Sequence, residues 1–596
     1  MVSEYMVLYI KWFVTILTAA VTLFNYPEVD PNLRPINVPT SRLLKEYDFI
    51  IVGSGAGGSP LANRLTEIKN WTVLLLEAGG DETVALDTPP LTFFNRLTNA
   101  NWNYSTVPQK YACKENRGVC NLPRGRVIGG STALYDLVWV RANRLDYDGW
   151  AAQGNPGWSY RDVLPYLIRL ENITDPSVID SPYHGRGGPM TVGISRYLTQ
   201  LVPHYLEAYK ELGLKEIDFD GESQIGYMVN RAASIDGMTC SVGRGYLRPI
   251  RNRTNLDVAE NAFVTKINID PDSKTATGVT FIRYGEEISI RARKEVIVSG
   301  GAVNSPQLLM LSGIGPAEHL TQLGIPVIQD LRVGDNTQSP LMIPVLFTQS
   351  AGNFNLNFEN TFNFQNLISY ALNGSGPLTT FNGLEAAGNF YNEEPPAVLG
   401  LPDTRSDFIS FQPFNLDDQV IVIITQSFGF TSKGTIRLAS TNPFEQPLID
   451  PQFLTTEIDR NRMQKSMRFP FRLAGTNAIQ RIGARFAQEL QPLCHFNGNV
   501  TDNFVSCIVE NYSFPPIELC CTCKMGPPGD TRAVVDPRLR VHGVKNLRVV
   551  DGSIIPTYIH SMPEATTVMI SERASDIIRE DYGQPVGKLP PIPPLV

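Results

Sequence analysis

The sequence predicts an α/β fold in which a discontinuous Rossmann-like domain carries an inserted second domain. Three stretches indicate this. Phe49 to Val52 is an apolar strand that runs into a glycine-rich turn and a helix, Glu295 to Gly301 repeats the strand-into-glycine pattern, and Asn546 to Gly552 is a late strand that contains an acid near its end. Because such segments occur at both ends and in the middle of the chain, the simplest architecture is one dinucleotide-type domain built from separate pieces, with the active site at the junction with the second domain.

The first 24 residues form a separate N-terminal segment, which we interpret as a signal peptide. Lys11 precedes an apolar run of 13 residues, Trp12 to Phe24, which suits the hydrophobic region of a secretory signal and is short for a membrane span. A retained anchor is the alternative, because Met6 to Ile10 extends the apolar stretch on the other side of Lys11. We therefore expect a secreted, extracellular protein without a stable membrane partner.

The composition limits the possible partners and fits secretion. The chain has 596 residues, 42% of them hydrophobic and 18% charged, so it can bury a large core. Its net charge is −8 and it has no long basic run, so we expect no nucleic-acid partner. Seven N-x-S/T sequons fit a glycosylated extracellular protein. These sequons begin at Asn70, Asn103, Asn172, Asn252, Asn373, Asn499 and Asn511.

Eight cysteines fit an oxidising compartment. Two local pairs are our disulfide candidates. The cluster Cys520-Cys521-Thr522-Cys523 would bind a metal only with partner ligands that the sequence does not offer, so buried or disulfide-bonded thiols are the favoured interpretation and no metal site is predicted. The two candidate pairs are Cys113/Cys120 and Cys494/Cys507.

The stretch from Tyr47 to Gly80 carries a dinucleotide fingerprint in its required context of strand, glycines, helix, second strand and acid. Gly53 permits the tight turn, Gly55 lets the backbone approach a pyrophosphate, and Gly58 allows close contact between helix and strand. The pyrophosphate would lie at the N-terminus of the helix, where N–H groups and the dipole favour an anion. Glu77 would accept hydrogen bonds from an adenosine ribose.

Further elements follow in chain order. A second Gly-Gly-Ser turn, Gly125 to Thr132, opens the apolar segment Ala133 to Val140 and predicts another anion-binding N-terminus. Arg161 to Glu171 and Val202 to Leu212 have helical patterns. Strand-like runs follow at 256–270, 278–291, 420–428 and 434–438, and a helix-like segment at 568–579.

Together these segments resemble the glucose–methanol–choline (GMC) flavoenzyme family, from about Tyr47 to Asp581. Gly53 to Glu77 matches its FAD fingerprint, and Gly125 through Asp148 matches its first signature except at one position. Gly301 to Gly315 matches its second signature. The stretch Cys523 to Pro527 is most similar to insect members, the glucose-dehydrogenase-like and salicyl-alcohol-oxidase-like enzymes.

The resemblance implies an FAD-containing oxidoreductase that acts on CH–OH donors and binds a small alcohol-type ligand. It implies an FAD-binding domain in three parts, residues 45–155, 233–330 and 533–590. It also implies an α+β substrate domain with an antiparallel sheet in two parts, 156–232 and 331–532. Besides Gly53, Gly55, Gly58 and Glu77, the cofactor contacts that it implies are Ala56, Trp102, Arg126, Gly130, Ser131, Tyr135, Val264, Asp551 and Gly552.

The catalytic end departs from the family pattern. Glu518 stands where the family has the His that accepts the alcohol proton, and Met562 stands where a second His or Asn lies opposite. Tyr135 stands where Asn or His usually contacts the flavin. Because the changes gather at the isoalloxazine and substrate end while the nucleotide end is kept, we expect weak or lost alcohol-oxidising activity.

Two alternatives stay open. In the first, the enzyme works with a rebuilt site. Glu518 would be the base if burial raises its pKa, although an ionised Glu cannot donate a hydrogen bond to an alkoxide. His560, two residues from Met562, would otherwise swing into the site. In the second alternative, the chain binds no flavin and is a carrier or structural glycoprotein.

Overall fold

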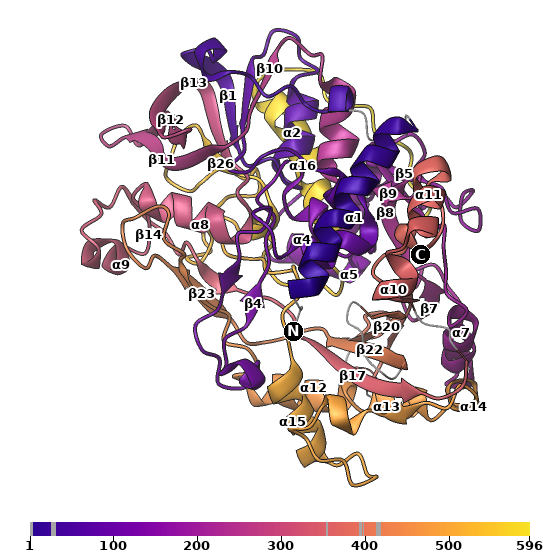
Figure 1. Cartoon of the computed structure of the whole chain (residues 1–596). Coiled ribbons are helices and arrows are strands. Elements are labelled where there is room, and N and C mark those ends of the chain that lie inside the picture. Colours follow the sequence, from indigo (N-terminus) through magenta and orange to yellow (C-terminus); the bar gives the residue numbers. More distant parts are fainter. Residues whose placement is uncertain are drawn as a thin grey trace.

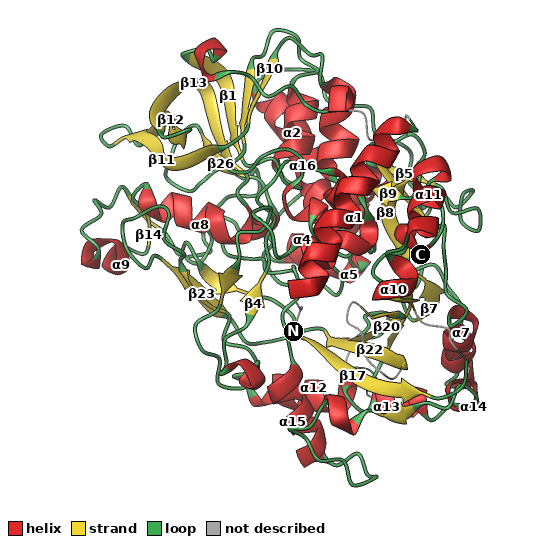
Figure 2. Ribbon diagram, viewed as in Figure 1, coloured by secondary structure: helices red, strands yellow, loops and turns green. Residues whose placement is uncertain are grey.

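The computed structural model of the chain describes residues 4–24, 31–352, 356–392, 396, 398–412 and 419–595. Two large sheets dominate these residues, one of seven strands and one of six. In Figure 1 the seven-stranded sheet is at the top of the molecule and the six-stranded sheet is at the bottom, and Figure 2 shows helices around both. This mixed α/β architecture confirms the predicted fold class.

The seven-stranded sheet has the order β10-β2-β1-β13-β12-β11, with β26 also paired to β13. The long strand β13 pairs in parallel with β1 and β26 through its second half and antiparallel with β12 through its first half. All residues of β1 after Glu46 are buried, as expected for a parallel strand covered on both faces. The strands are β1 (Glu46–Val52), β2 (Val73–Leu76), β10 (Leu256–Ala259), β11 (Ala262–Asp270), β12 (Thr275–Arg283), β13 (Glu286–Val298) and β26 (Leu547–Val549).

This sheet collects strands from the beginning, the middle and the end of the chain, so the predicted discontinuous Rossmann-like domain is confirmed. Three helices belong to it: α2 (Gly58–Leu65), α8 (Gly301–Leu311) and α16 (Glu564–Asp581). Helices α2 and α16 pack against each other beside the sheet (Figure 1). The residue boundaries of the five predicted parts stay a prediction.

The six-stranded sheet is antiparallel throughout, with the order β25-β17-β22-β20-β19-β7. Along each strand, successive side chains point to opposite faces of the sheet. Ile343 and Val345 of β17 belong to the core that the sheet shares with the helices below it, whereas Met342 and Pro344 line a cavity on the other face. The strands are β7 (Gly226–Val229), β17 (Met342–Gln349), β19 (Leu384–Phe390), β20 (Thr404–Ile409), β22 (Gln419–Ser427) and β25 (Arg485–Phe486).

Smaller elements complete the two halves. The helices beside the six-stranded sheet are α7 (Val202–Glu211), α12 (Glu457–Ser466), α13 (Phe469–Ala474), α14 (Asn477–Gln480) and α15 (Asp502–Tyr512). Elsewhere lie α3 (Val84–Asp87), α4 (Thr92–Asn95), α5 (Arg144–Ala152), α6 (Tyr160–Arg169), α9 (Ala317–Gln322), α10 (Phe358–Thr361) and α11 (Phe364–Asn373). The short strands are β3 (Tyr104–Ser105), β4 (Asn121–Leu122), β5 (Glu171–Ile173), β6 (Met190–Ile194), β8 (Arg231–Ile235), β9 (Met238–Thr239), β14 (Ile314–Gly315), β15 (Gln329–Asp330), β16 (Asp335–Thr337), β18 (Leu356–Asn357), β21 (Phe411–Gln412), β23 (Gly434–Arg437) and β24 (Leu448–Asp450).

The second predicted anion-binding helix start is different in the structure. Only a four-residue 3₁₀ turn, Gly130–Ala133, follows the Gly-Gly-Ser sequence. The chain then continues without a helix to Val140, and Leu137 has a φ of +66°, outside the helical region. A turn this short has no helical dipole to offer, so this segment contributes only its backbone and small side chains.

The N-terminal helix α1 (Glu4–Leu23) crosses the face of the molecule that points toward the viewer in Figure 1. Its buried side packs Phe13 and Leu17 into an aromatic cluster that includes Phe362 and Tyr370. Residues Met6–Leu23 have a mean hydropathy of 1.8 and are long and apolar enough to cross a membrane, a property that signal sequences share.

Both predicted local disulfides are present: Cys113–Cys120 and Cys494–Cys507, with Cα atoms 5.5 and 5.6 Å apart. The cluster near residue 520 contains a third disulfide, between the neighbours Cys520 and Cys521. Cys523 is a buried free thiol. The prediction of buried or disulfide-bonded thiols in this cluster is therefore confirmed.

Candidate functional site

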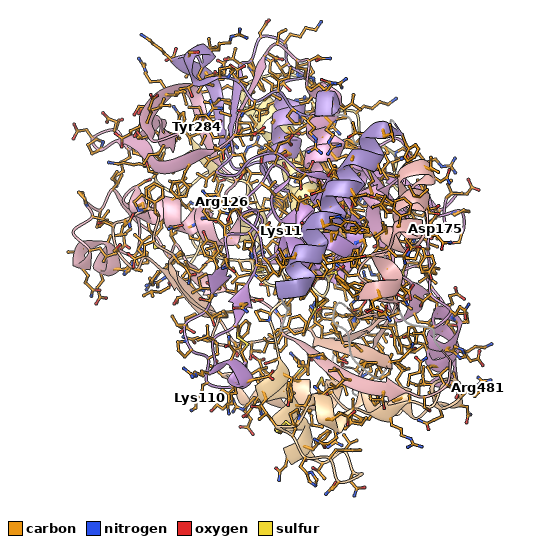
Figure 3. The ribbon with its side chains drawn as sticks, viewed as in Figure 1. Lys11, Lys110, Arg126, Asp175, Tyr284 and Arg481 are labelled. Carbon is orange, nitrogen blue, oxygen red and sulfur yellow. A yellow bond between two sulfur atoms is a disulfide. The ribbon has the colours of Figure 1, made fainter. Side chains whose placement is uncertain are left out.

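A cavity of about 640 Å³ lies between the two large sheets. One end is formed by the glycine turns that follow β1 and β13, and the other end by the cavity face of β17, β20 and β22. Its walls therefore come from segments far apart in the sequence. Figure 3 shows the side chains that fill the molecule, with Arg126 in the central region above the six-stranded sheet.

The turn after β1 can be built only with glycine at two positions. Gly53 has a φ of +98°, and a Cβ there would lie 2.4 Å from the carbonyl oxygen of Ser299. A Cβ at Gly58 would lie 1.8 Å from the carbonyl oxygen of Gly53, so Gly58 lets α2 approach β1 and does not line the cavity. A Cβ at Gly55 would meet only the Cα of Gly130, at 3.7 Å, so the backbone at Gly55 stays open to a ligand.

Glu77 lies at the end of β2 and holds this turn. Its Oε2 accepts hydrogen bonds from the Ser54 amide (3.0 Å) and hydroxyl (2.7 Å), and its Oε1 accepts one from the Gly79 amide (2.8 Å). Burial raises the pKa of Glu77, while these donors lower it. Glu77 thus fixes the glycine turn in addition to lining the cavity.

The remaining nucleotide-end residues form the cavity wall. The Trp102 ring stacks on Tyr104 at 5.8 Å between centroids, and the Arg126 guanidinium lies 4.8 Å from the Trp102 ring centre. Arg126 itself does not line the cavity. Asp551 accepts hydrogen bonds from the Gly301 amide (2.8 Å) and the Ser305 hydroxyl (2.6 Å), and so ties β26 to the start of α8. The predicted cofactor residues that do line it are Gly53, Gly55, Ala56, Glu77, Trp102, Gly130, Ser131, Tyr135, Val264, Asp551 and Gly552.

These residues fit a dinucleotide. The backbone at Gly55 is open on the cavity side, with Gly130 packed closely against it, and it lies just before the N-terminal end of α2, where amide groups favour an anion. The apolar part of the cavity continues from there toward β17 and β22. The cavity therefore offers a polar end for a pyrophosphate and an apolar end for a ring system.

Glu518 is the centre of the other end. Its side chain is 6% exposed, and its Oε2 accepts hydrogen bonds from the Tyr558 hydroxyl (2.5 Å) and the Gln426 amide (3.3 Å). Burial raises the pKa of Glu518 to about 7. Arg124 lies on the same wall and donates to the Leu519 carbonyl (3.3 Å). A carboxyl with this pKa can take or give a proton near neutral pH.

Met562 lines the cavity with a side chain that cannot donate a hydrogen bond. His560 does not line it. The His560 ring Nδ1 lies 2.7 Å from Asp146 Oδ1, and the His560 amide donates to Asp146 Oδ2 at 3.0 Å. His560 is thus bound to Asp146 and is not among the residues that line the cavity, although the rebuilt-site alternative requires it to be.

Two further acidic and phenolic groups face the cavity beside Met562. The Tyr135 hydroxyl donates to the Val138 carbonyl (2.7 Å). Glu564 is the first residue of α16, and its buried carboxyl group interacts with the Tyr135 side chain. Burial raises the pKa of both Tyr135 and Glu564 well above their usual values. Burial therefore favours the uncharged form of both groups.

Several lining residues were missed by sequence reasoning. The turn Ser299–Gly301 had a signal, because its strand-into-glycine pattern repeats that of the first fingerprint. Asp407 on β20, which pairs with Arg405 at 2.7 Å, had none, because its place on the cavity face depends on strand pairing. The main residues in this group are Phe93, Arg96, Arg124, Ser299, Gly301, Asp407 and Phe411.

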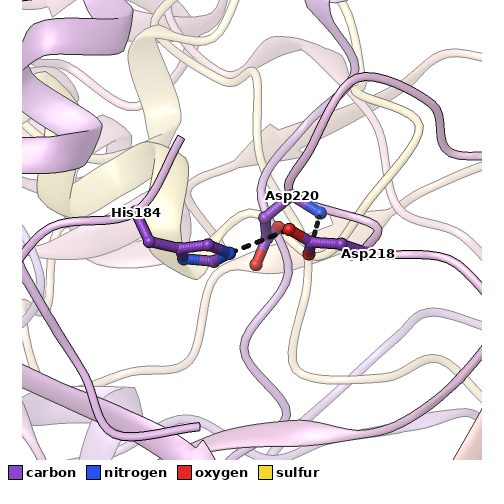
Figure 4. A group of neighbouring side chains, drawn as sticks. All are labelled: His184, Asp218 and Asp220. Carbon is purple, nitrogen blue, oxygen red and sulfur yellow. Dashed lines mark hydrogen bonds and ion pairs between the residues drawn. The ribbon is translucent and has the colours of Figure 1, made fainter. Parts of the chain in front are cut away.

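A separate polar cluster lies outside the cavity (Figure 4). His184, Asp218 and Asp220 bring their ligand-type atoms within 4.8 Å of one another. However, both ring nitrogens of His184 are used, at 2.8 Å from Glu171 and 3.0 Å from Asp218, and the Arg231 guanidinium is 2.7 Å from Asp218. Burial lowers the pKa of His184, but hydrogen bonds to Asp218 and Glu171 outweigh this effect and raise the pKa to about 9. The cluster is a buried ion-pair network whose positive charge comes from His184, Arg231 and Arg141, which lies 2.7 Å from Glu171.

Comparison with known proteins gives consistent matches across the chain. Residues 47–341 match the N-terminal family model of GMC oxidoreductases, and residues 431–571 match the C-terminal model. Glucose dehydrogenase [FAD, quinone] of Drosophila melanogaster is 34% identical over 91% of this chain and 88% of its own length. Ecdysone oxidase of Bombyx mori is 31% identical, covering 90% and 82%. Human mitochondrial choline dehydrogenase is 34% identical, covering 91% and 90%.

Solved structures agree in fold. An FAD-dependent oxidoreductase from Chaetomium thermophilum superposes with a TM-score of 0.82 at 25% identity, covering 90% of this chain and all of the other. Formate oxidase from Aspergillus oryzae has a TM-score of 0.80 at 24% identity, covering 90% and 99%. Because its identity is below 25%, the match to formate oxidase shows similarity of fold alone.

Proposed function

The chain belongs to the GMC oxidoreductase family, and we propose that it is a secreted, FAD-binding member with weak or no alcohol-oxidising activity. FAD is the cofactor of this proposal, because the relatives are named as FAD enzymes and the cavity fits a dinucleotide. Gly53, Gly55, Gly130 and Trp102 would hold its nucleotide half. When bound, FAD supplies a hydride acceptor for a CH–OH donor.

The single observation that carries the proposal of weak activity is the pair Glu518 and Met562 on the substrate side of the cavity. Alcohol oxidation needs a base for the hydroxyl proton and a donor for the developing alkoxide. Glu518 can accept the proton only in its ionised form, which burial disfavours. Met562 offers no donor. Losing a positioned base costs about 10²–10⁴ in rate, and losing a donor costs about 10²–10³.

The reductive half-reaction tests this proposal directly. Purified protein is mixed anaerobically with a panel of small alcohols and sugars, and the flavin absorbance is followed. We expect the protein to show the absorbance of oxidised flavin, and we expect that none of the compounds reduces this absorbance quickly. Rapid bleaching by any simple alcohol would refute the proposal of weak activity, and a colourless protein that takes up no FAD would refute FAD binding.

One alternative has a specific observation in its favour. Arg124 and Glu518 line the same wall of the cavity, and among the described residues the Arg124 Nε has no hydrogen-bond partner. A working site would use Glu518 as base and Arg124 as the donor that faces the alkoxide. If the wild type turns over an alcohol, Glu518→Gln should abolish flavin reduction, whereas His560→Gln should leave it unchanged because His560 does not line the cavity.

Secretion is supported by the two local disulfides, the apolar N-terminal helix and the position of the sequons. Five of the seven sequon asparagines are exposed and two are partly buried. N-terminal sequencing of protein recovered from the medium should begin after the apolar run that ends at Phe24. Recovery in the membrane fraction with an intact N-terminus would instead support a retained anchor.

A further inference from the structure

The Cys520–Cys521 disulfide lies in the wall of the functional cavity. Both residues are fully buried, and Cys520 lines the cavity two residues after Glu518. The Cys520 amide donates to the Gln338 carbonyl (2.9 Å), and the Cys521 amide donates to the carbonyl of the cavity-lining Gly552 (3.2 Å). The disulfide is therefore held against the same segment, Asp551 to Gly552, that closes the cofactor end of the cavity.

The backbone does not explain the presence of a cysteine at position 521. Cys521 has a φ of +76°, in the left-handed region that glycine adopts without cost and other residues avoid. A cysteine here costs on the order of 1 kcal/mol or more in backbone strain, so the reason for it lies in its sulfur.

We propose that Cys520–Cys521 is a redox-active pair that accepts two electrons from the reduced FAD of the same cavity. This inference rests on the proposed FAD binding. In the step, a hydride equivalent from the reduced cofactor and one proton would break the S–S bond and form two thiols, and the cofactor would return to its oxidised form, FAD. Glu518, on the same wall, can deliver the proton because its pKa is about 7. The reverse reaction returns the two electrons to FAD.

The other cysteines are not expected to take part. The disulfides Cys113–Cys120 and Cys494–Cys507 do not line the cavity. Burial raises the pKa of the Cys523 thiol, and a protonated thiol is a poor nucleophile, so Cys523 does not exchange with the neighbouring disulfide. The vicinal pair is thus an isolated acceptor beside the cofactor.

An anaerobic dithionite titration of the FAD-loaded protein tests the proposal. A two-electron flavin and a two-electron disulfide should together take about four electrons per FAD. Anaerobic alkylation with iodoacetamide in denaturant after the titration, followed by peptide mass spectrometry, should label Cys520 and Cys521. The double variant Cys520→Ser/Cys521→Gly, which places the permitted glycine at the left-handed position, should take about two electrons. The matched control Cys113→Ser/Cys120→Ser should still take about four.

The outcomes separate this inference from the proposed function. FAD-loaded protein that takes only about two electrons, with no alkylation at Cys520 and Cys521, overturns the redox role of the pair and leaves FAD binding intact. Protein that cannot be loaded with FAD overturns both proposals. If the wild type takes about four electrons but the double variant does too, the second acceptor is another group, and the inference is also overturned.

Discussion

The buried carboxyl of Glu518 should make the stability of the protein depend on pH in a way that Glu518→Gln removes. The pKa of Glu518 is about 7 in the folded protein, against 4.5 for a free glutamate, because burial disfavours the charged form. Below pH 4.5 the carboxyl is protonated in both states and costs nothing. As pH rises from 4.5 to about 7, the unfolded chain releases this proton while the folded chain keeps it, so the folded state loses stability.

The size of the effect follows from the difference between the two pKa values. It corresponds to about 3 kcal/mol at pH 7 and above, relative to pH 4. Glutamine has the same shape and cannot ionise, so Glu518→Gln should gain stability relative to the wild type by about this amount as pH rises between these limits.

Thermal melts of wild type and Glu518→Gln at matched protein concentration and scan rate measure the effect, at pH values from 4.5 to 8. We expect the difference in Tm to widen in favour of the variant up to about pH 7 and then to stay constant. Glu222→Gln, which changes an exposed carboxyl, is the control and should keep a constant difference. A Glu518→Gln difference that is independent of pH would show that the carboxyl is not desolvated in the folded protein.

Three further predictions follow from the described contacts. Gly53→Ala should lose FAD binding and much of its soluble yield, because the new Cβ would lie 2.4 Å from a carbonyl oxygen and the φ of Gly53 is +98°. The control Gly149→Ala has open space around the new Cβ and should keep both. The flavin absorbance per mole of purified protein measures the result. Glu518→His combined with Met562→His should raise the rate of flavin reduction by an alcohol by about 10²-fold or more, measured by stopped flow, and an unchanged rate would contradict the roles assigned to these positions. His184→Gln should destabilise the fold by about 3 kcal/mol at pH 6, because it removes the positive charge that His184 places between Glu171 and Asp218, although Arg141 and Arg231 still pair with these carboxylates. Since the pKa of His184 is raised to about 9, this loss should shrink as pH rises through 9, and denaturant unfolding at pH 6 and 9.5 should detect the change.

The glycine turn at one end of the cavity was predictable from local sequence. The tight turn with a φ of +98° at Gly53 and the close helix contact at Gly58 both require glycine. The order and spacing of strand, glycines, helix and acid can therefore be recognised in the amino-acid sequence. The two local disulfides were predictable for the same reason, because short loops bring their cysteines together. The segment after Gly130 was predicted less well, since a short 3₁₀ turn and a helix begin with the same residues.

The sequence by itself determined the family, the discontinuous sheet and the substitutions at positions 518 and 562. Only the tertiary structure decided what those substitutions do. The pKa of Glu518 depends on burial and on Tyr558 and Gln426, which come from distant parts of the chain. The turn of His560 toward Asp146 and the contact of the Cys520–Cys521 disulfide with the cofactor end of the cavity depend in the same way on chain segments that meet only in the fold. Burial, charge environment and access to a cavity depend on tertiary contacts between distant segments, and no local sequence pattern encodes them.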